Sequence, residues 1–230
     1  MHERAAFTVF ATAIGDCALA WNEVGVLGAW LPEATATRLR MRLAKRFAQA
    51  TEARPEGLSA AAVAAITALL DGERTDLGFI RIDDSRIDPF DRRVYATART
   101  IPVGRVVSYA ELAARVGEDA SAREVGQSLG RNPFPIIVPC HRIVASSGEL
   151  GGFSAPGGVA TKRRLLTIED ARRDGVDDLF DQPSTALFYG PGVGAGRATS
   201  ARVAQVASVP GSIAGTPSSS ATLIEVSGRS

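Results

Sequence analysis

The chain has 230 residues, a net charge of +1 and 45% hydrophobic residues, values that are typical of a globular protein. Its two cysteines are too few for a disulfide framework, and no stretch reaches the roughly 18 apolar residues that span a bilayer. The N-terminal segment also lacks the unbroken apolar core of a signal peptide. We therefore expect a cytoplasmic protein with no membrane contact, and the global charge identifies no partner.

The N-terminal 86 residues predict a small α+β domain. Residues 6–31 are rich in Val, Phe, Trp and Thr and are interrupted by glycines, which is typical of two or three short strands. Residues 34–48 and 58–71 predict two helices, of which the first is amphipathic with arginines between its apolar positions. The alternating residues 77–84 predict a further strand. None of these segments carries evident chemistry.

Residues 87–171 predict a second, mainly helical domain. Capping-box signatures, Ser108 with Glu111 and Ser121 with Glu124, mark the starts of two short helices. Because only about four residues separate these helices, they form a helix-turn-helix candidate. The helices predicted for this domain cover residues 90–100, 109–116, 122–130 and 160–170.

The rest of the chain differs in composition from these two segments. Residues 172–230 consist largely of Gly, Pro, Ser, Ala and Thr without periodicity, which predicts a disordered tail. Residues 89–170, by contrast, carry 11 basic and 8 acidic residues. This mildly basic balance permits nucleic-acid binding without requiring it.

A Cys-His pair lies inside the stretch NPFPIIVPCHRIVASSG, residues 132–148. The apolar run 134–138 predicts a buried strand that leads into Cys140 and His141. The thiol could be a buried structural cysteine, a metal ligand or a nucleophile. A metal site is disfavoured because the few Cys and His residues have no zinc-like spacing. Prolines that stiffen the approach, and the cationic group of Arg142, favour a nucleophile.

A nucleophilic Cys140 requires a base, because a free thiol has a pKa of about 8.5. His141 can take the proton if a third group orients its imidazole. Side chains of adjacent residues point to opposite faces of an extended chain, so a bridging water or a sharp bend is expected between Cys140 and His141. Glu169 is the candidate for the orienting carboxylate, and Glu149 is its local rival.

The order of motifs around this pair resembles a known family. Pro139-Cys-His-Arg142, preceded by Asn132-Pro133, is similar to the active-site signature of the O6-alkylguanine-DNA alkyltransferases, the methylated-DNA–protein-cysteine methyltransferases. The resemblance covers residues 88–170 firmly and residues 6–85 weakly. Further motifs in the family's order and spacing are Ile101-Pro-Val-Gly104, Ser108-Tyr109, Arg123-Glu-Val-Gly126, Gly151-Gly-Phe-Ser154, and Lys162 followed by Leu165-Leu166 and Glu169.

The resemblance implies an α+β fold in three parts. Residues 1–86 would form a small ribonuclease-H-like domain. Residues 87–171 would form the DNA-binding alkyltransferase domain, helical with a winged-helix-like helix-turn-helix and the active-site cysteine. Residues 172–230 would remain the tail.

The resemblance also implies DNA repair by direct reversal. Cys140 would take the alkyl group from O6-alkylguanine in duplex DNA after the base has flipped out, and would keep it in a single, suicidal turnover. The protein would need no cofactor and no metal. It would act as a monomer whose helix-turn-helix lies in the minor groove.

The resemblance assigns roles to further residues of the site. His141 would act through a water, with Glu169 as its orienting group. The residues expected to serve the DNA and the base are Asn132 as a hinge, Tyr109 at the guanine ring, Arg123 as the finger that fills the gap, main-chain groups near Ile143 and Ser154, and Gly126 and Arg131 on or beside the recognition helix.

Three positions depart from the family's pattern. Glu124 stands where many members have alanine, and its carboxylate would either complete the capping box with Ser121 or weaken DNA binding. Phe153 replaces a common tyrosine, which removes one hydroxyl near the leaving oxygen. The run 154–158 is also slightly longer than usual, so the pocket wall is expected to differ.

Three other classes of protein compete with this interpretation. One is a non-catalytic alkyltransferase-like damage binder, which would lack the reactive cysteine that is present here as Cys140. A cysteine hydrolase would draw its histidine from a distant segment, where only His2 is available. A transcriptional regulator of this family would add a cysteine-rich zinc domain, which Cys17 alone cannot build.

Overall fold

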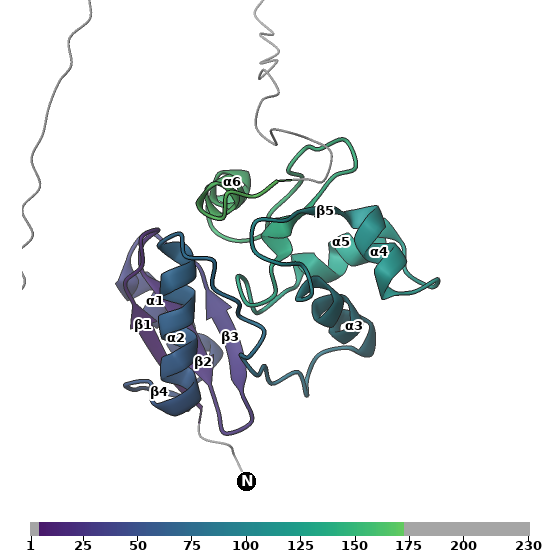
Figure 1. The fold of residues 1–230 in the computed structure, drawn as a ribbon. Coiled ribbons are helices and arrows are strands. Elements are labelled where there is room, and N and C mark those ends of the chain that lie inside the picture. Colours follow the sequence, from purple (N-terminus) through teal and green to yellow (C-terminus); the bar gives the residue numbers. More distant parts are fainter. Residues whose placement is uncertain (1–4, 173–230) are drawn as a thin grey trace, which may run out of the picture. The chain divides into compact units, whose positions relative to one another are not determined.

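The N-terminal part of the protein is built on one small sheet. The computed structural model describes residues 5–172, so the tail predicted for 172–230 lies outside the described residues apart from Arg172. The sheet has the strand order β3-β2-β1-β4, in which β1, β2 and β3 are antiparallel neighbours and β4 runs parallel to β1 (Figure 1). Its strands are β1 (Ala6–Phe10), β2 (Cys17–Trp21), β3 (Val26–Trp30) and β4 (Thr51–Glu52).

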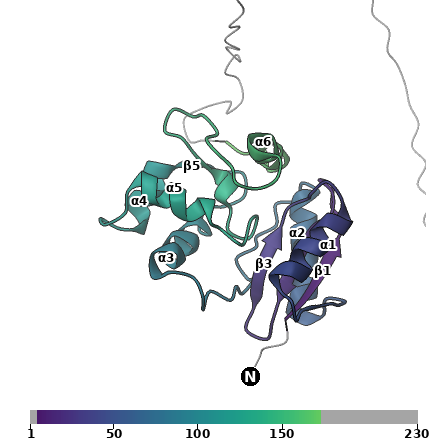
Figure 2. The ribbon, with the colours of Figure 1, turned by 180° about the vertical axis from the view of Figure 1, so that it is seen from behind.

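Two helices, α1 (Ala36–Arg46) and α2 (Gly57–Leu70), pack on opposite faces of this sheet. Successive side chains of a strand point to opposite faces. Accordingly, Leu19 of β2 packs in one cluster with Ile66 of α2, whereas Ala20 packs in another with Leu39 of α1. Helix α2 is in front of the sheet in Figure 1, and α1 is in front in the reverse view of Figure 2.

The C-terminal part is mainly helical, and its predicted helices are confirmed within a few residues. Both predicted capping boxes are present, at Ser108 with Glu111 and at Ser121 with Glu124. The two short strands pair in parallel. The elements are α3 (Pro89–Ala98), β5 (Val107–Ser108), α4 (Tyr109–Val116), α5 (Ala122–Gly130), the 3₁₀ turn η1 (Cys140–Arg142), β6 (Ile143–Val144) and α6 (Gly158–Ile168). The architecture is therefore mixed α+β.

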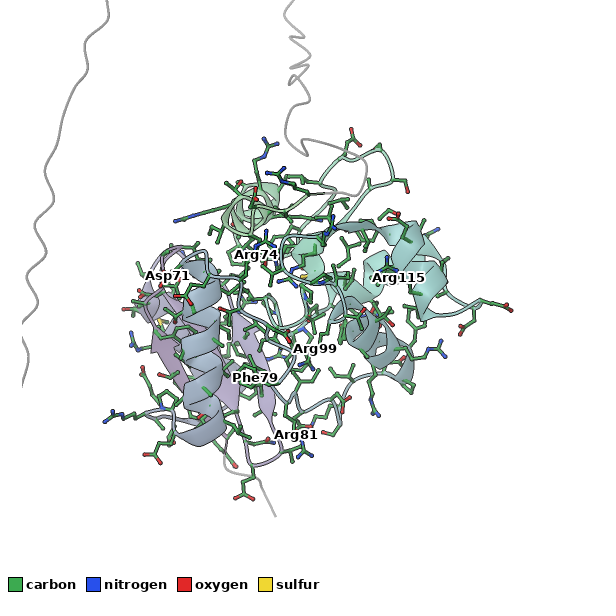
Figure 3. The ribbon with its side chains drawn as sticks, viewed as in Figure 1. Asp71, Arg74, Phe79, Arg81, Arg99 and Arg115 are labelled. Atoms are coloured by element: carbon green, nitrogen blue, oxygen red, sulfur yellow. The ribbon has the colours of Figure 1, made fainter. Side chains whose placement is uncertain are left out.

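The strand predicted for residues 77–84 is wrong. This segment is irregular, and only Ile82 forms an isolated bridge, with Val26 of β3. Its carbonyl groups are occupied by a side chain, because one guanidinium nitrogen of Arg99 lies within 3.3 Å of the carbonyl oxygen of Leu77 and closer still to those of Gly78 and Ile80. Arg99 comes from the end of α3 (Figure 3), so a side chain holds the first half of the segment. The second half is attached to β3 by main-chain hydrogen bonds of Val26 with Arg81 at 2.9 Å and with Asp83 at 2.8 Å.

The buried strand predicted for residues 134–138 is also wrong, although its apolar residues are buried. The chain makes a tight turn here, closed by a hydrogen bond from the Val138 amide to the Phe134 carbonyl at 2.8 Å. Ile136 has a φ of 74°, a conformation that β-branched residues rarely adopt. Pro133 and Pro135 lack the N–H groups that a strand ladder needs, which is the physical reason for the difference.

The N-terminal and C-terminal parts share one hydrophobic core. The main cluster of buried residues runs from Cys17 to Leu165, and all described residues fall within one compact unit. Main-chain contact is direct, since the Ala29 amide of β3 donates to the Pro133 carbonyl at 3.0 Å. The proposed division between residues 86 and 87 stays a prediction. No helix within residues 5–172 is long and apolar enough to cross a bilayer.

Candidate active site

Cys140 begins the 3₁₀ turn η1, and the protein buries its side chain. Asn132 holds this turn in place, because its side-chain amide lies 3.4 Å from Cys140 Sγ and donates to the Val138 carbonyl at 3.1 Å. The other end of the same amide accepts a hydrogen bond from the Phe134 main chain at 2.9 Å. One side chain thus ties the end of α5, the tight turn and the thiol together.

A buried group of charged and polar side chains lies beside Cys140. His141 Nε2 is 2.9 Å from Glu169 Oε1, and both side chains are almost fully buried. Arg142 binds the same carboxylate through two nitrogens at 2.8 Å each and donates a third bond to the Ile101 carbonyl at 2.6 Å. The rival carboxylate Glu149 is exposed, and its described bond is to Ser147.

The hydrogen bonds of His141 identify its tautomer. Although burial opposes ionisation of Glu169, His141 and Arg142 lower the pKa of this carboxyl group to about 2, so it is an acceptor at neutral pH. Burial lowers the pKa of His141 and favours the neutral ring. Nε2 therefore carries the proton, and Nδ1 keeps its lone pair. Nδ1 is buried without a hydrogen-bond partner among the described residues.

The surroundings of Cys140 keep its thiol protonated. Burial raises its pKa, against the opposing effects of the Asn132 hydrogen bond and the charge of Lys162. The thiol becomes a nucleophile when a base removes its proton, and the neighbouring imidazole has a free lone pair that can act as this base. The chain bends in a 3₁₀ turn at Cys140 and His141, and no hydrogen bond joins the thiol to His141 Nδ1 among the described residues.

Lys162 of α6 is fully buried, which is unusual for a lysine. Its ammonium group donates to the Ile143 carbonyl and lies 5.8 Å from the centre of the Tyr109 ring. Burial lowers its pKa to about 8, while the proximity of Cys140 acts in the opposite direction. The site therefore contains, in Lys162, a buried amine that titrates close to neutral pH.

A pocket of about 440 Å³ opens onto Cys140. Tyr109 forms one wall, and small residues keep the space in front of its ring open, since a Cβ at Gly126 or Gly151 would come within 3.7 Å of this ring. The residues that line the pocket are Tyr109, Gly126, Leu129, Gly130, Cys140, Gly152, Phe153 and Ser154.

A second pocket of about 250 Å³ shares Gly130, Cys140, Phe153 and Ser154 with the first. Its other walls come from both parts of the chain. Arg42 and Arg46 of α1 line it together with Arg131 and Asn132. Sequence reasoning found no chemistry in the N-terminal domain, because only tertiary packing brings α1 to the thiol.

The remaining predicted site residues differ in exposure and in hydrogen-bond partners. Arg123 is exposed on α5 and pairs with none of the described carboxylates. Arg131, expected at the DNA, is itself exposed and binds the largely buried Asp91 through three hydrogen bonds of 2.8 to 3.2 Å. Ile143 is buried in β6, and Ser154 is exposed at the pocket wall.

Two of the departures from the family's pattern have a structural account. Glu124 completes the capping box, since it accepts from the Ser121 main chain at 3.0 Å and from the Ser121 hydroxyl at 2.5 Å. Its carboxylate is therefore directed at the start of its own helix. Phe153 is half-buried and lies on the boundary of both pockets. Ser128 of α5 is fully buried, so its small size serves packing within the domain.

The buried roles of Arg142 and Lys162 were not predicted. Both are charged residues, which are normally expected at the surface. Their burial depends on partners from distant elements of the chain. The family's motifs include both Arg142 and Lys162, and this was the available signal. Within residues 5–172 no group of His, Cys, Asp and Glu side chains is arranged to hold a metal ion.

Comparison with known proteins agrees with this geometry. The family model described as "6-O-methylguanine DNA methyltransferase, DNA binding domain" matches residues 89–171. This range contains the helix-turn-helix, the thiol and its partner groups. Fold and site together define a cysteine methyltransferase of the DNA-repair class.

Individual relatives extend the match into the N-terminal part. The methylated-DNA–protein-cysteine methyltransferase of Mycobacterium tuberculosis is 40% identical over 125 residues, which are 54% of this chain and 73% of the relative. Crystal structures of the M. tuberculosis O6-methylguanine methyltransferase and of the same enzyme in complex with DNA superimpose with TM-scores of 0.58 and 0.57 at 32% and 31% identity. The match to the first structure covers 76% of this chain and 97% of the relative's chain. The match to the DNA complex covers 72% of this chain and 92% of the relative's chain. The chain belongs to the methylated-DNA–protein-cysteine methyltransferase family.

Proposed function

We propose that this protein repairs DNA by direct reversal, by moving the alkyl group of O6-alkylguanine in duplex DNA onto Cys140. The observation that carries the proposal is the thiol at the junction of two pockets, next to a histidine whose free nitrogen is buried without a partner among the described residues. Membership of a cysteine methyltransferase family supports the same reaction.

The proposed reaction is an in-line displacement at the alkyl carbon. His141 Nδ1 accepts the thiol proton through a water, and Glu169 stabilises the imidazolium that forms. The sulfur then forms a bond to the alkyl carbon as the carbon–oxygen bond breaks, and the electron pair of that bond stays on the guanine. Tyr109, in the wall of the pocket, donates a hydrogen bond to the guanine ring as this charge develops.

The transfer uses each protein molecule once. The product is a thioether, whose sulfur is a poor leaving group, and no second thiol lines the described pocket to accept the alkyl group from Cys140. The expected stoichiometry is one alkyl group per chain.

Base flipping follows from the position of the thiol. O6 of guanine is enclosed in a duplex, and Cys140 is enclosed in the protein, so the nucleotide must leave the stack at a cost of a few kcal/mol. Arg123, exposed and without a described acidic partner, fills the vacancy. Gly126 allows close approach of α5 to the minor groove, and Asn132 fixes the hinge between α5 and the thiol.

Main-chain groups hold the base edge in this proposal. The Ile143 carbonyl already accepts from Lys162, but a carbonyl has two lone pairs and can also accept from the guanine amino group. Ser154, which lines the pocket, supplies a second group. Arg131 contributes a guanidinium that Asp91 keeps in place.

The finer fold assignments are part of the proposal. A ribonuclease-H-like N-terminal domain is supported by the strand order β3-β2-β1-β4 with its single parallel pair. A winged-helix-like C-terminal domain is supported by α4 and α5 next to the β5–β6 pair. The solved structure of a relative in complex with DNA supports duplex DNA as the partner, and action as a monomer is part of the same proposal.

The decisive experiment follows a labelled methyl group. The full-length protein is incubated with duplex DNA that contains O6-[³H-methyl]guanine, and label on the protein is counted. We expect transfer that stops at one methyl group per chain. Cys140→Ala should abolish transfer, whereas Cys17→Ala should leave it intact, because Cys17 lies buried in β2 with burial raising its pKa to about 11.

Three outcomes would contradict the proposal. Absence of label on the wild-type protein would exclude the reaction, and transfer that persists in Cys140→Ala would exclude this nucleophile. Release of more than one equivalent of alkylated product would show turnover by a hydrolase.

A further inference from the structure

Helix α1 is strongly basic in a chain of almost no net charge. Its eleven residues contain no acidic side chain, while the whole chain has a net charge of +1. The cationic residues of α1 are all exposed, and they are Arg38, Arg40, Arg42, Lys45 and Arg46. Such a concentration of like charge is unfavourable for the isolated helix, because like charges three and four residues apart repel.

Most of these cations lie along one side of the helix. Arg38, Arg42 and Arg46 follow one another at intervals of four residues, and Lys45 is three residues beyond Arg42, so the four share a face. We call them the α1 basic stripe. Arg40 is outside this spacing, and its guanidinium binds Glu52 of β4 at 2.8 Å.

The α1 basic stripe reaches the active site. Arg42 and Arg46 line the 250 Å³ pocket that has Cys140 in its wall, and Arg131 and Asn132 from the end of α5 line the same pocket. This pocket joins the larger one through Cys140, Phe153 and Ser154. The stripe therefore continues the surface on which the proposed substrate would lie.

The charges in this pocket are unequally compensated. Arg42 is bonded to Glu33 at 2.7 Å, and Arg131 is bonded to Asp91. Arg46 has no carboxylate partner within residues 5–172, and its guanidinium lies 5.7 Å from the centre of the adjacent Phe47 ring. Arg46 is thus the pocket arginine whose charge is available to a ligand.

We propose that the α1 basic stripe, through Arg46 and with Arg42 beside it, is a second DNA-binding surface that holds backbone phosphates next to the flipped nucleotide. This inference rests on the proposed function. It gives the N-terminal part of the chain a role in binding, in addition to the helix-turn-helix.

The chemistry of the stripe fits phosphate. A guanidinium can donate two parallel hydrogen bonds to phosphate oxygens, and its charge displaces condensed counterions from DNA. The stripe is continuous with the DNA-binding domain matched at residues 89–171. A nucleotide rotated out of the duplex also carries its flanking phosphates toward the protein, where a cation at the pocket rim can meet them.

The test measures the salt dependence of binding to an unmodified duplex of about 20 base pairs, by fluorescence anisotropy, with full-length proteins. Each phosphate that a variant no longer neutralises lowers the slope of log K against log salt by about 0.9. We expect Arg46→Gln to reduce the slope by about this amount and to weaken binding several-fold. Arg46→Lys keeps the charge and should keep most of the slope.

Arg40→Gln is the matched control, since it removes the same charge from the opposite side of the same helix and should leave the slope unchanged. Thermal unfolding of each variant verifies that the fold is intact. A wild-type slope in Arg46→Gln, or an equal reduction in Arg40→Gln, would overturn the inference. Failure of the proposed function is a separate result, because it appears as absent methyl transfer in the wild-type protein.

Discussion

At the scale of single residues, the site combines a protonated thiol with a base that is ready to receive its proton. Burial raises the pKa of Cys140 and lowers that of His141, so both groups are neutral before reaction. A thiol that stays protonated resists oxidation, because thiolates are the reactive form of cysteine.

The buried group of His141, Arg142 and Glu169 depends on the negative charge of Glu169. Its pKa is lowered to about 2 in the folded protein, from an ordinary value near 4.5. A depressed carboxyl pKa contributes stability that is present above the unfolded pKa and lost as the pH falls toward the folded one. The shift corresponds to roughly 3 kcal/mol of unfolding free energy. We expect this contribution to disappear between about pH 4.5 and pH 2.

Glu169→Gln tests this expectation by urea unfolding over a pH series. The variant should be less stable than the wild type at pH 7 by roughly 3 kcal/mol, because the buried Arg142 loses its anion. The difference between the two proteins should narrow from pH 5 downward. A difference that is constant from pH 7 to pH 2.5 would refute the assigned ionisation.

At the scale of elements, side chains replace regular secondary structure at the junction of the two parts of the chain. Arg99, at the end of α3, donates to three carbonyl groups in the segment that follows α2. The tight turn after α5 is held in a similar way by Asn132. Both side chains hold irregular backbone whose main-chain hydrogen bonds to the sheet are few, at Val26 and Ala29 of β3.

Arg99→Met removes these donors while it keeps the apolar part of the side chain. We predict a loss of about 1–3 kcal/mol in unfolding free energy, because the carbonyls lose their protein donors and regain only partial hydration. Urea unfolding measures the change. Arg115→Met, at an exposed arginine of α4 (Figure 3), should change stability by no more than about 0.5 kcal/mol. Equal effects of the two substitutions would argue against the role of Arg99.

At the scale of the whole molecule, the described chain closes on itself before the low-complexity segment begins. Arg172 forms main-chain bonds to Gly104 at 3.0 Å and to Val106 at 3.2 Å, and these bonds tie the end of the described chain to the strand β5 region. One core cluster also spans both parts of the chain. All the proposed site residues lie within this closed region.

A chain that ends at Arg172 should therefore retain methyl transfer with the stoichiometry of the full-length protein. The labelled-DNA assay compares the two proteins at equal concentration, and thermal unfolding compares their stability. Loss of transfer by a protein that unfolds at the same temperature as the full-length chain would show that the remaining residues take part in the reaction.

Much of this protein follows from local sequence pattern. Periodicity and capping boxes predicted the helices, because these signals act within one or two turns of the chain. The two predicted strands that failed, at 77–84 and 134–138, were apolar or alternating segments whose hydrogen bonds go to Arg99 and to a tight turn. Such partners are distant in sequence or depend on an unusual φ, and periodicity does not encode them.

By itself, the sequence determined the helix positions, the neighbouring Cys140 and His141, and the family to which their flanking motifs point. Only the tertiary structure decided which charges are buried and which side chains meet. It placed Glu169 and Arg142 around the imidazole, enclosed Lys162, and brought Arg46 to the pocket of the thiol. The physical reason is that burial and electrostatic pairing are properties of three-dimensional proximity, whereas local pattern fixes only the conformation of nearby backbone.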